Sequence, residues 1–156
     1  MKFLHLYLWQ FLAAFQVSYC LRLLFLRIPE SRPEGKDVIL TCEFDLEGDI
    51  LYTIKWFHND QEFFRFSPSE EPSTMFFPSR GIKLDLNQTT NTSVVLRDLE
   101  LTSTGMFRCE VLTDAPHFQT VTAEAFMVVG EFYSGAYREI SQSFCFIVIL
   151  FIIYYL

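Results

Sequence analysis

The chain has 156 residues and a formal net charge of −7 at pH 7, which suits one domain and leaves little room for a second. The excess of acidic residues argues against a nucleic-acid-binding protein, because such proteins need a basic surface to meet phosphate groups. Both ends of the chain are strongly apolar, so we consider them apart from the residues between them.

The first twenty residues have the layout of a secretory signal peptide. Lys2 provides a short positive region, residues 3–17 are largely apolar, and Ser18 and Cys20 place small residues at a cleavage site. The apolar run is too short for a secure membrane span, and a buried first helix is the alternative. We predict a signal peptide over residues 1–20 and a domain over residues 21–130.

Several segments of this domain have the composition of β-strands. Runs of β-branched and apolar residues, or apolar residues that alternate with polar ones, are typical of strands. They lie at residues 21–28, 38–44, 51–58, 62–66, 82–86, 93–99, 106–112 and 118–129. Residues 67–79 contain three prolines and are expected to form a loop or a ragged edge. Short strands at this spacing, without a convincing helix, predict an all-β sandwich.

Two cysteines lie inside the predicted domain, Cys42 and Cys109. A secreted chain most simply pairs two such residues in a disulfide. Trp56 follows Cys42 by fourteen residues, and Cys, Trp and Cys at this spacing are the signature of an immunoglobulin domain. The cysteines are 67 residues apart, which leaves room for the extra strands of the variable type. We therefore predict an immunoglobulin-like, variable-type β-sandwich with the Trp56 ring beside the disulfide.

Phe107 departs from this signature. Immunoglobulin domains place a tyrosine two residues before the second cysteine, and its hydroxyl bonds back to the chain. The Phe107 ring can fill the same position in the core, but it has no hydroxyl. The missing hydrogen bond is expected to cost about 1 kcal/mol of stability, which does not change the predicted fold.

The pattern of residues indicates neither an enzyme nor a metal site. His58 and His117 are the histidines of the predicted domain, and neither lies in a nucleophile motif. The acidic residues that alternate over residues 43–49 do not match an EF-hand loop. We expect no catalytic residue, no cofactor and no metal. A hydrolase assembled from residues far apart in the sequence is the alternative.

Alternation along the strands predicts which side chains face away from the core. If Trp56 and Cys109 point inward, their alternate neighbours point outward and form a candidate partner-binding face. These residues are Thr53, Lys55, Phe57, Arg108, Glu110 and Leu112. Lys55 and Glu110 could pair across neighbouring strands. Phe57 could join Phe64 and Phe66 in an apolar patch of the kind that marks interaction sites. In the alternative, Phe64 or Phe66 points inward.

Two segments are acceptors for N-glycosylation, Asn87-Gln88-Thr89 and Asn91-Thr92-Ser93. In a secreted chain they predict glycans on Asn87 and Asn91, at surface positions away from the partner-binding face.

The last residues resemble the signal for a glycosylphosphatidylinositol anchor. Ser134 and Gly135 begin a run of small residues within a spacer over residues 131–143, and residues 144–156 are all apolar. We predict anchor attachment at Ser134 or Gly135. A short membrane-spanning tail and an incorrect terminus of the gene model are the alternatives.

Several segments together resemble the beaten-path family of arthropod immunoglobulin-domain proteins. They lie at residues 21–29, 42–49, 51–57, 62–66, 81–86, 108–111 and 115–121, and the resemblance covers roughly residues 21–128. It implies a secreted or membrane-anchored protein of axon guidance whose partners are immunoglobulin receptors of the sidestep family. Many members carry a second immunoglobulin-like domain, for which this chain has no room. A soluble modulator or decoy without an anchor is the alternative function.

Overall fold

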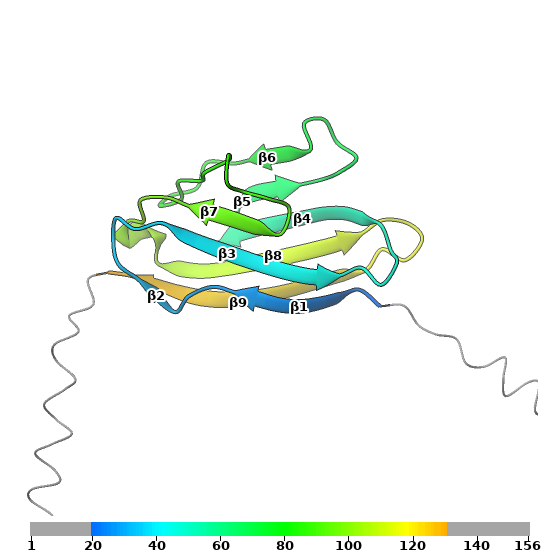
Figure 1. Ribbon diagram of the computed structural model, residues 1–156, viewed down its shortest axis with the longest axis horizontal. Coiled ribbons are helices and arrows are strands. Elements are labelled where there is room, and N and C mark those ends of the chain that lie inside the picture. Colours follow the sequence, from blue (N-terminus) through cyan, green and yellow to red (C-terminus); the bar gives the residue numbers. More distant parts are fainter. Residues whose placement is uncertain (1–19, 131–156) are drawn as a thin grey trace, which may run out of the picture.

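Two β-sheets packed face to face form the structure, a computed structural model that describes residues 20–130 (Figure 1). The smaller sheet has the strand order β1-β3-β7, and the larger has the order β2-β9-β8-β4-β5-β6. The strands are β1 (Arg22–Arg27), β2 (Ser31–Arg32), β3 (Val38–Asp45), β4 (Leu51–His58), β5 (Gln61–Phe66), β6 (Thr74–Phe76), β7 (Ser93–Leu96), β8 (Gly105–Thr113) and β9 (Thr120–Val129). One short 3-10 turn, η1 (Leu101–Ser103), precedes β8. The predicted all-β sandwich is confirmed.

Several predictions concern residues outside this described range. They are the signal peptide up to residue 19, the anchor site at Ser134 and Gly135, the spacer over residues 131–143 and the tail over residues 144–156. Between residues 20 and 130, no helix is long and apolar enough to cross a membrane.

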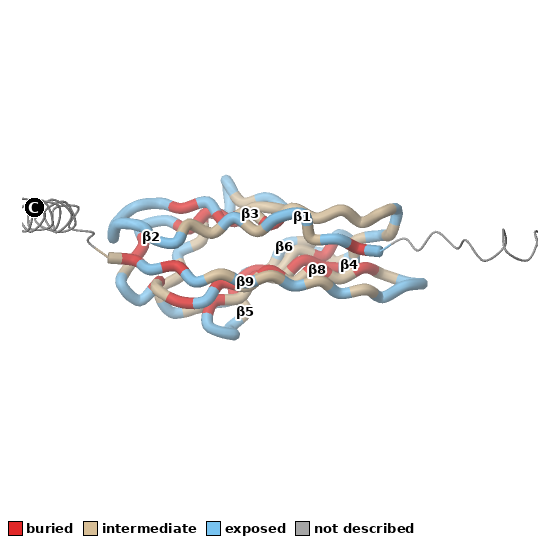
Figure 2. The backbone as a smooth tube through the Cα atoms, turned by 90° about the horizontal axis from the view of Figure 1, so that it is seen from below, coloured by how far each residue is buried: buried red, intermediate tan, exposed pale blue. Residues whose placement is uncertain are grey.

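The core is built around the predicted disulfide. Cys42 on β3 and Cys109 on β8 are bonded, with their Cα atoms 6.5 Å apart, so the bridge joins the two sheets. Trp56 lies directly opposite Cys109 in the β4–β8 pairing, and its side chain is fully buried. Figure 2 shows the two layers edge-on, with β3 and β1 in one and β9, β8 and β4 in the other.

Phe107 fills its predicted core position. Its ring centroid lies 4.7 Å from that of His58 and 6.3 Å from that of Phe63, which meets it edge to face. Phe107 has no hydroxyl to bond to the backbone, but the Ser103 hydroxyl makes such a bond nearby. Ser103 Oγ donates to the carbonyl of Gly81 at 2.5 Å. A Cβ on Gly81 would lie 2.5 Å from the carbonyl carbon of Thr102, and Gly81 has a φ of +77°, so this close approach requires glycine.

The predicted strand over residues 82–86 is wrong. Its alternating pattern produces only one bridge, between Leu84 and Leu96. The chain then turns, because the Asp85 carboxylate accepts from the amide of Asn87 at 3.1 Å and the Asp85 carbonyl accepts from the Thr89 hydroxyl at 2.7 Å. Such bonds between a short polar side chain and the nearby backbone compete with strand pairing.

The predicted ragged edge is present as strand β6, which pairs with β5 at the rim of the larger sheet. At the opposite rim, the N-terminal segment divides between the two sheets. Strand β1 runs antiparallel to β3, whereas β2 runs parallel to β9. Pro29 lies between β1 and β2, and its missing N–H interrupts the ladder where the chain changes sheets.

Candidate functional site

The candidate site is the surface of strands β9, β8 and β4 that points away from the smaller sheet. We call this surface the outer face. Burial alternates along β8, with every second residue fully or nearly fully buried. The residues between them, together with their neighbours on β4 and β9, point away from the smaller sheet. The outer face comprises Lys55, Phe57, Met106, Arg108, Glu110, Leu112, Thr122, Glu124, Phe126 and Val128.

Three of the four charged side chains of the outer face, Lys55, Glu110 and Arg108, have ion-pair partners within the chain. Lys55 Nζ lies 3.4 Å from Glu110 Oε1, as expected from their opposite positions. Arg108 reaches Asp60 at 2.8 Å. On β5, Arg65 bonds Glu62 at 2.7 Å, and this bond raises the pKa of the guanidinium. Pairs that are partly open to solvent, as these are, contribute about 1 kcal/mol or less each, so they neutralise the surface more than they stabilise the fold.

The predicted apolar patch of Phe57, Phe64 and Phe66 does not form. Phe64 is buried in the core, and Phe66 packs partly buried against it. The reason is an irregularity in the β4–β5 pairing. Trp56 lies opposite Phe64, but Phe57 lies opposite Glu62, so the extra residue Phe63 is buried beside Phe64. The alternative, with these rings pointing inward, is therefore the correct one.

Phe57 remains on the outer face, but Arg108 covers it. The Arg108 guanidinium carbon lies 4.5 Å from the centroid of the Phe57 ring, a cation–π contact. The two side chains are half-buried together, so Phe57 presents less apolar surface than its outward direction suggests.

Thr53 is a second correction to the predicted face. Its side chain is buried, at 2% exposure. Its hydroxyl donates to the carbonyl of Phe66 at 3.1 Å and accepts from the hydroxyl of Ser67 at 3.0 Å. The chain beyond β5 covers Thr53, so it is not available to a partner.

The main apolar surface of the outer face consists of three residues that do not belong to the predicted partner-binding face. Met106 and Phe126 lie directly opposite each other on β8 and β9, and Val128 is the next outward residue of β9. They are 37%, 51% and 39% exposed. We call them the apolar strip. Alternation predicts the two positions on β9, because the buried Met127 and Val129 flank Val128 and leave Phe126 and Val128 on the opposite side of the strand. The predicted face extended only around Trp56 and Cys109.

A second exposed surface lies on the loops at the far end of β9 from the apolar strip. Ile50 and Phe118 are 66% and 70% exposed. The two loops are held together by a bond from the amide of Asp114 to the carbonyl of Ile50 at 2.8 Å. His117 Nδ1 also lies 2.7 Å from Asp49 Oδ1. We call Ile50 and Phe118 the loop tip.

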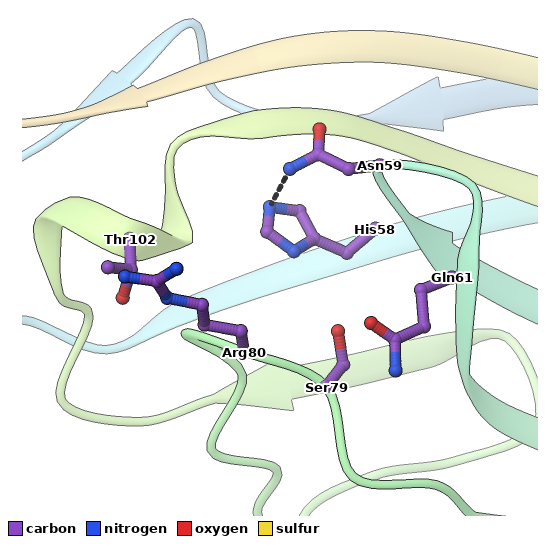
Figure 3. Close-up of a pocket in the computed structure, with 6 residues that line it drawn as sticks. All are labelled: His58, Asn59, Gln61, Ser79, Arg80 and Thr102. Carbon is purple, nitrogen blue, oxygen red and sulfur yellow. Dashed lines mark hydrogen bonds between the residues drawn. The ribbon is translucent and has the colours of Figure 1, made fainter.

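A small polar pocket of about 280 Å³ lies at the opposite end of the sandwich from this tip (Figure 3). It is lined by His58, Asn59, Gln61, Ser79, Arg80 and Thr102. His58 Nε2 lies 3.3 Å from the amide nitrogen of Asn59. Burial lowers the pKa of His58, partly offset by the backbone of Thr104 and Ser103, so the imidazole is neutral at pH 7. The His58 ring is thus packed in the core, with its Nε2 atom beside the side-chain amide of Asn59. Among the described residues, no three His, Cys, Asp or Glu side chains gather closely enough to bind a metal.

The two predicted glycosylation sites lie between Leu86 and β7. Asn87 and Asn91 are both exposed, and neither belongs to the outer face. Asn91 also lines a groove together with Phe76 and Leu86.

Solved structures resemble this chain in fold. The V domain of amphioxus IgVJ-C2 has a TM-score of 0.51 at 16% identity, over 65% of this chain and 99% of that one. A marsupial T cell receptor has a TM-score of 0.51 at 21% identity, over 72% and 38% of the two chains. The tandem V-type regions of VCBP3, a v-region-containing chitin binding protein, reach 0.52 at 14% identity, over 76% and 48%.

No family model matches the chain, and no curated protein matches it. At these levels of identity the structural likeness concerns the fold alone. The chain shares with these structures a variable-type arrangement of two β-sheets, which in this chain are joined by the Cys42–Cys109 disulfide. The described residues adopt an immunoglobulin-like β-sandwich fold of the variable type.

Proposed function

We propose that this chain is an extracellular recognition protein that binds another cell-surface protein through its outer face. The apolar strip of Met106, Phe126 and Val128 is the observation that carries this proposal. An exposed apolar cluster bordered by polar residues is typical of protein interfaces. Because Lys55, Glu110 and Arg108 have ion-pair partners within the chain, a protein that covers these side chains does not bury an unpaired charge.

The disulfide supports an extracellular location. A fully buried Cys42–Cys109 bridge at the centre of the core requires an oxidising compartment during folding. The predicted signal peptide leads to the same compartment. We propose that the protein resides on the outer face of the plasma membrane, held by an anchor at Ser134 or Gly135. The second possibility is a soluble form that acts as a modulator or decoy.

The partner that we propose is an immunoglobulin-family receptor of the sidestep type, and the process is axon guidance. This narrower proposal is supported by the resemblance of several segments to the beaten-path family. The variable-type fold is compatible with it, because the outer face is a broad strand surface of the kind that two immunoglobulin domains can bring together.

The test is a binding screen of the secreted chain against cell-surface immunoglobulin receptors, followed by variants. We expect Phe126→Glu and Met106→Glu each to weaken binding about 30-fold or more, the effect of losing a contact worth ~2 kcal/mol. Ile39→Glu is the matched control, since Ile39 is 56% exposed on β3 of the other sheet. Phe118→Glu tests the loop tip.

Two results would contradict the proposal. One is full binding by both outer-face variants, and the other is an equal loss from Ile39→Glu. If only Phe118→Glu weakened binding, the partner would bind at the loop tip and not at the outer face. Unchanged melting temperatures of the variants serve as the control for folding. Release of the protein from cells by a phosphatidylinositol-specific phospholipase separates the anchored form from the soluble one.

A further inference from the structure

An apolar groove opens along the edge of the sandwich beside β6. It has a volume of about 340 Å³. Its lining consists of Phe64, Phe66, Thr74, Phe76, Leu86, Thr89, Thr90 and Asn91. Strands β5 and β6 of the larger sheet form one wall, and the turns between Leu86 and β7 form the other. The groove is present because residues 82–86 form a single bridge where a full strand would have extended the smaller sheet.

The pairing of β5 and β6 explains why the groove is apolar. Phe64 lies opposite Phe76, and Phe66 lies opposite Thr74. Directly paired residues project from the same face of a sheet, and the buried Phe64 identifies this face as the inner one. Phe76 therefore continues the inner face beyond the edge of the core. It is 60% exposed, and Leu86 on the other wall is 45% exposed.

We propose that the first sugar residues of an N-glycan on Asn91 occupy this groove. Asn91 is both the acceptor of the Asn91-Thr92-Ser93 motif and a lining residue of the groove. Its position is fixed by a tight turn, in which the amide of Thr90 donates to the carbonyl of Ser93 at 2.8 Å. The amide of Ser93 donates to Thr90 Oγ1 at 3.1 Å. A glycan on Asn91 therefore starts at the mouth of the groove.

The lining suits N-acetylglucosamine. One face of this sugar presents polarised C–H groups, which are attracted to the negative face of an aromatic ring such as Phe76. Its hydroxyl and acetamido groups need hydrogen-bond partners at the rim, and Thr74 has a hydroxyl without a partner among the described residues. The volume is at the low end of small-molecule sites, which fits one or two sugar residues.

Covalent attachment makes weak stacking sufficient. A tethered group has an effective concentration in the range of about millimolar, so a modest affinity fills the site. Occupation also covers the rim of β6, the last strand of its sheet. A bare edge strand beside exposed Phe76 and Leu86 is a template for association with other chains.

Asn87 is a matched control for a glycan that lies outside the groove. Asn87 carries the neighbouring acceptor motif and is exposed, but it does not line the groove. Asn87→Gln leaves a glycan only on Asn91, and Asn91→Gln leaves one only on Asn87. Both are secreted as full chains from cells that attach oligomannose glycans, and occupancy is measured by mass spectrometry.

Two glycosidases then test the position of the first sugar. Endoglycosidase H cleaves the glycan so that one N-acetylglucosamine stays on the asparagine. Peptide N-glycosidase F, applied to the intact glycan in a separate sample, removes every sugar. For Asn87→Gln we expect the complete removal to lower the melting temperature by about 4 °C and to raise the fluorescence of bound anilinonaphthalene sulfonate about twofold. Endoglycosidase H leaves both readouts near those of the intact protein. In Asn91→Gln, neither enzyme changes them.

Phe76→Ser removes the wall on which the sugar stacks, and the 60% exposure of Phe76 makes the substitution compatible with folding. In the Asn87→Gln background it abolishes the effect of deglycosylation. The double variant Asn87→Gln/Asn91→Gln controls for the charge, because it carries neither a glycan nor the aspartate that peptide N-glycosidase F leaves at residue 91, and we expect its two readouts to match those of the fully deglycosylated Asn87→Gln protein. An unoccupied Asn91, or equal responses with and without Phe76, would overturn the proposal. No partner takes part in these measurements, so their outcome is separate from that of the binding screen.

Discussion

Removal of the Cys42–Cys109 disulfide gives the sharpest test of how this domain is stabilised. The bridge closes a loop of 67 residues. Restricting the unfolded chain by a loop of this length contributes about 4 kcal/mol at 25 °C in the chain-entropy model. A domain of this size has a free energy of unfolding of roughly 5–15 kcal/mol. The variant with both Cys42→Ala and Cys109→Ala therefore retains its fold by a small margin.

The assay is equilibrium unfolding in urea, followed by Trp56 fluorescence. We expect the free energy of unfolding to fall by about 4 kcal/mol, and the m-value to rise because the unbridged unfolded chain exposes more surface. Ile39→Thr is the matched control, since Ile39 lies on the same strand as Cys42 but is 56% exposed, and its replacement should change neither value appreciably. A loss below about 1 kcal/mol would refute the loop-closure reasoning and assign the stability to the packing of β4 and β8.

Three further predictions concern single side chains. Trp56 Nε1 is buried without an acceptor among the described residues, so Trp56→Phe should cost about 1–2 kcal/mol in urea unfolding, against the ~3–5 expected for Trp56→Ala. The pKa of His58 is lowered from 6.5 by burial, so the unfolded chain takes up a proton first as the pH falls below 6.5. The melting temperature should then fall, and His58→Phe should reduce this slope; an equal slope in the variant would contradict the reasoning. A double-mutant cycle on Lys55 and Glu110 should give a coupling under about 1 kcal/mol, and a larger value would show a stronger pair than their exposure implies.

The centre of the fold could be predicted because its determinants are local or tightly spaced. Cys42, Trp56 and Cys109 lie in strands whose alternation is regular, so period two places them correctly on the inner face. The outer positions of Lys55 and Glu110 follow from the same alternation. The apolar strip was equally accessible to this reasoning, since β9 alternates without interruption at Phe126.

The errors share a physical cause, which is pairing that depends on the neighbouring strand. Residues 62–64 contain one residue more than the opposite segment of β4 can match, and sequence alone does not show which ring enters the core. Thr53 was misplaced because the chain after β5 covers it. The alternation of residues 82–86 has the appearance of a strand, but bonds to Asp85 turn the chain away.

The division of the N-terminal segment between two sheets has a mechanical consequence. Strand β2 runs parallel to β9, with bonds from the amide of Val128 to the carbonyl of Glu30 and from the amide of Gly130 to that of Arg32. The first and last described residues lie at opposite ends of the sandwich (Figure 1). Tension between them therefore pulls β2 and β9 past each other along their length. Their bonds bear such a load together, in shear, whereas strands that unzip break one bond at a time.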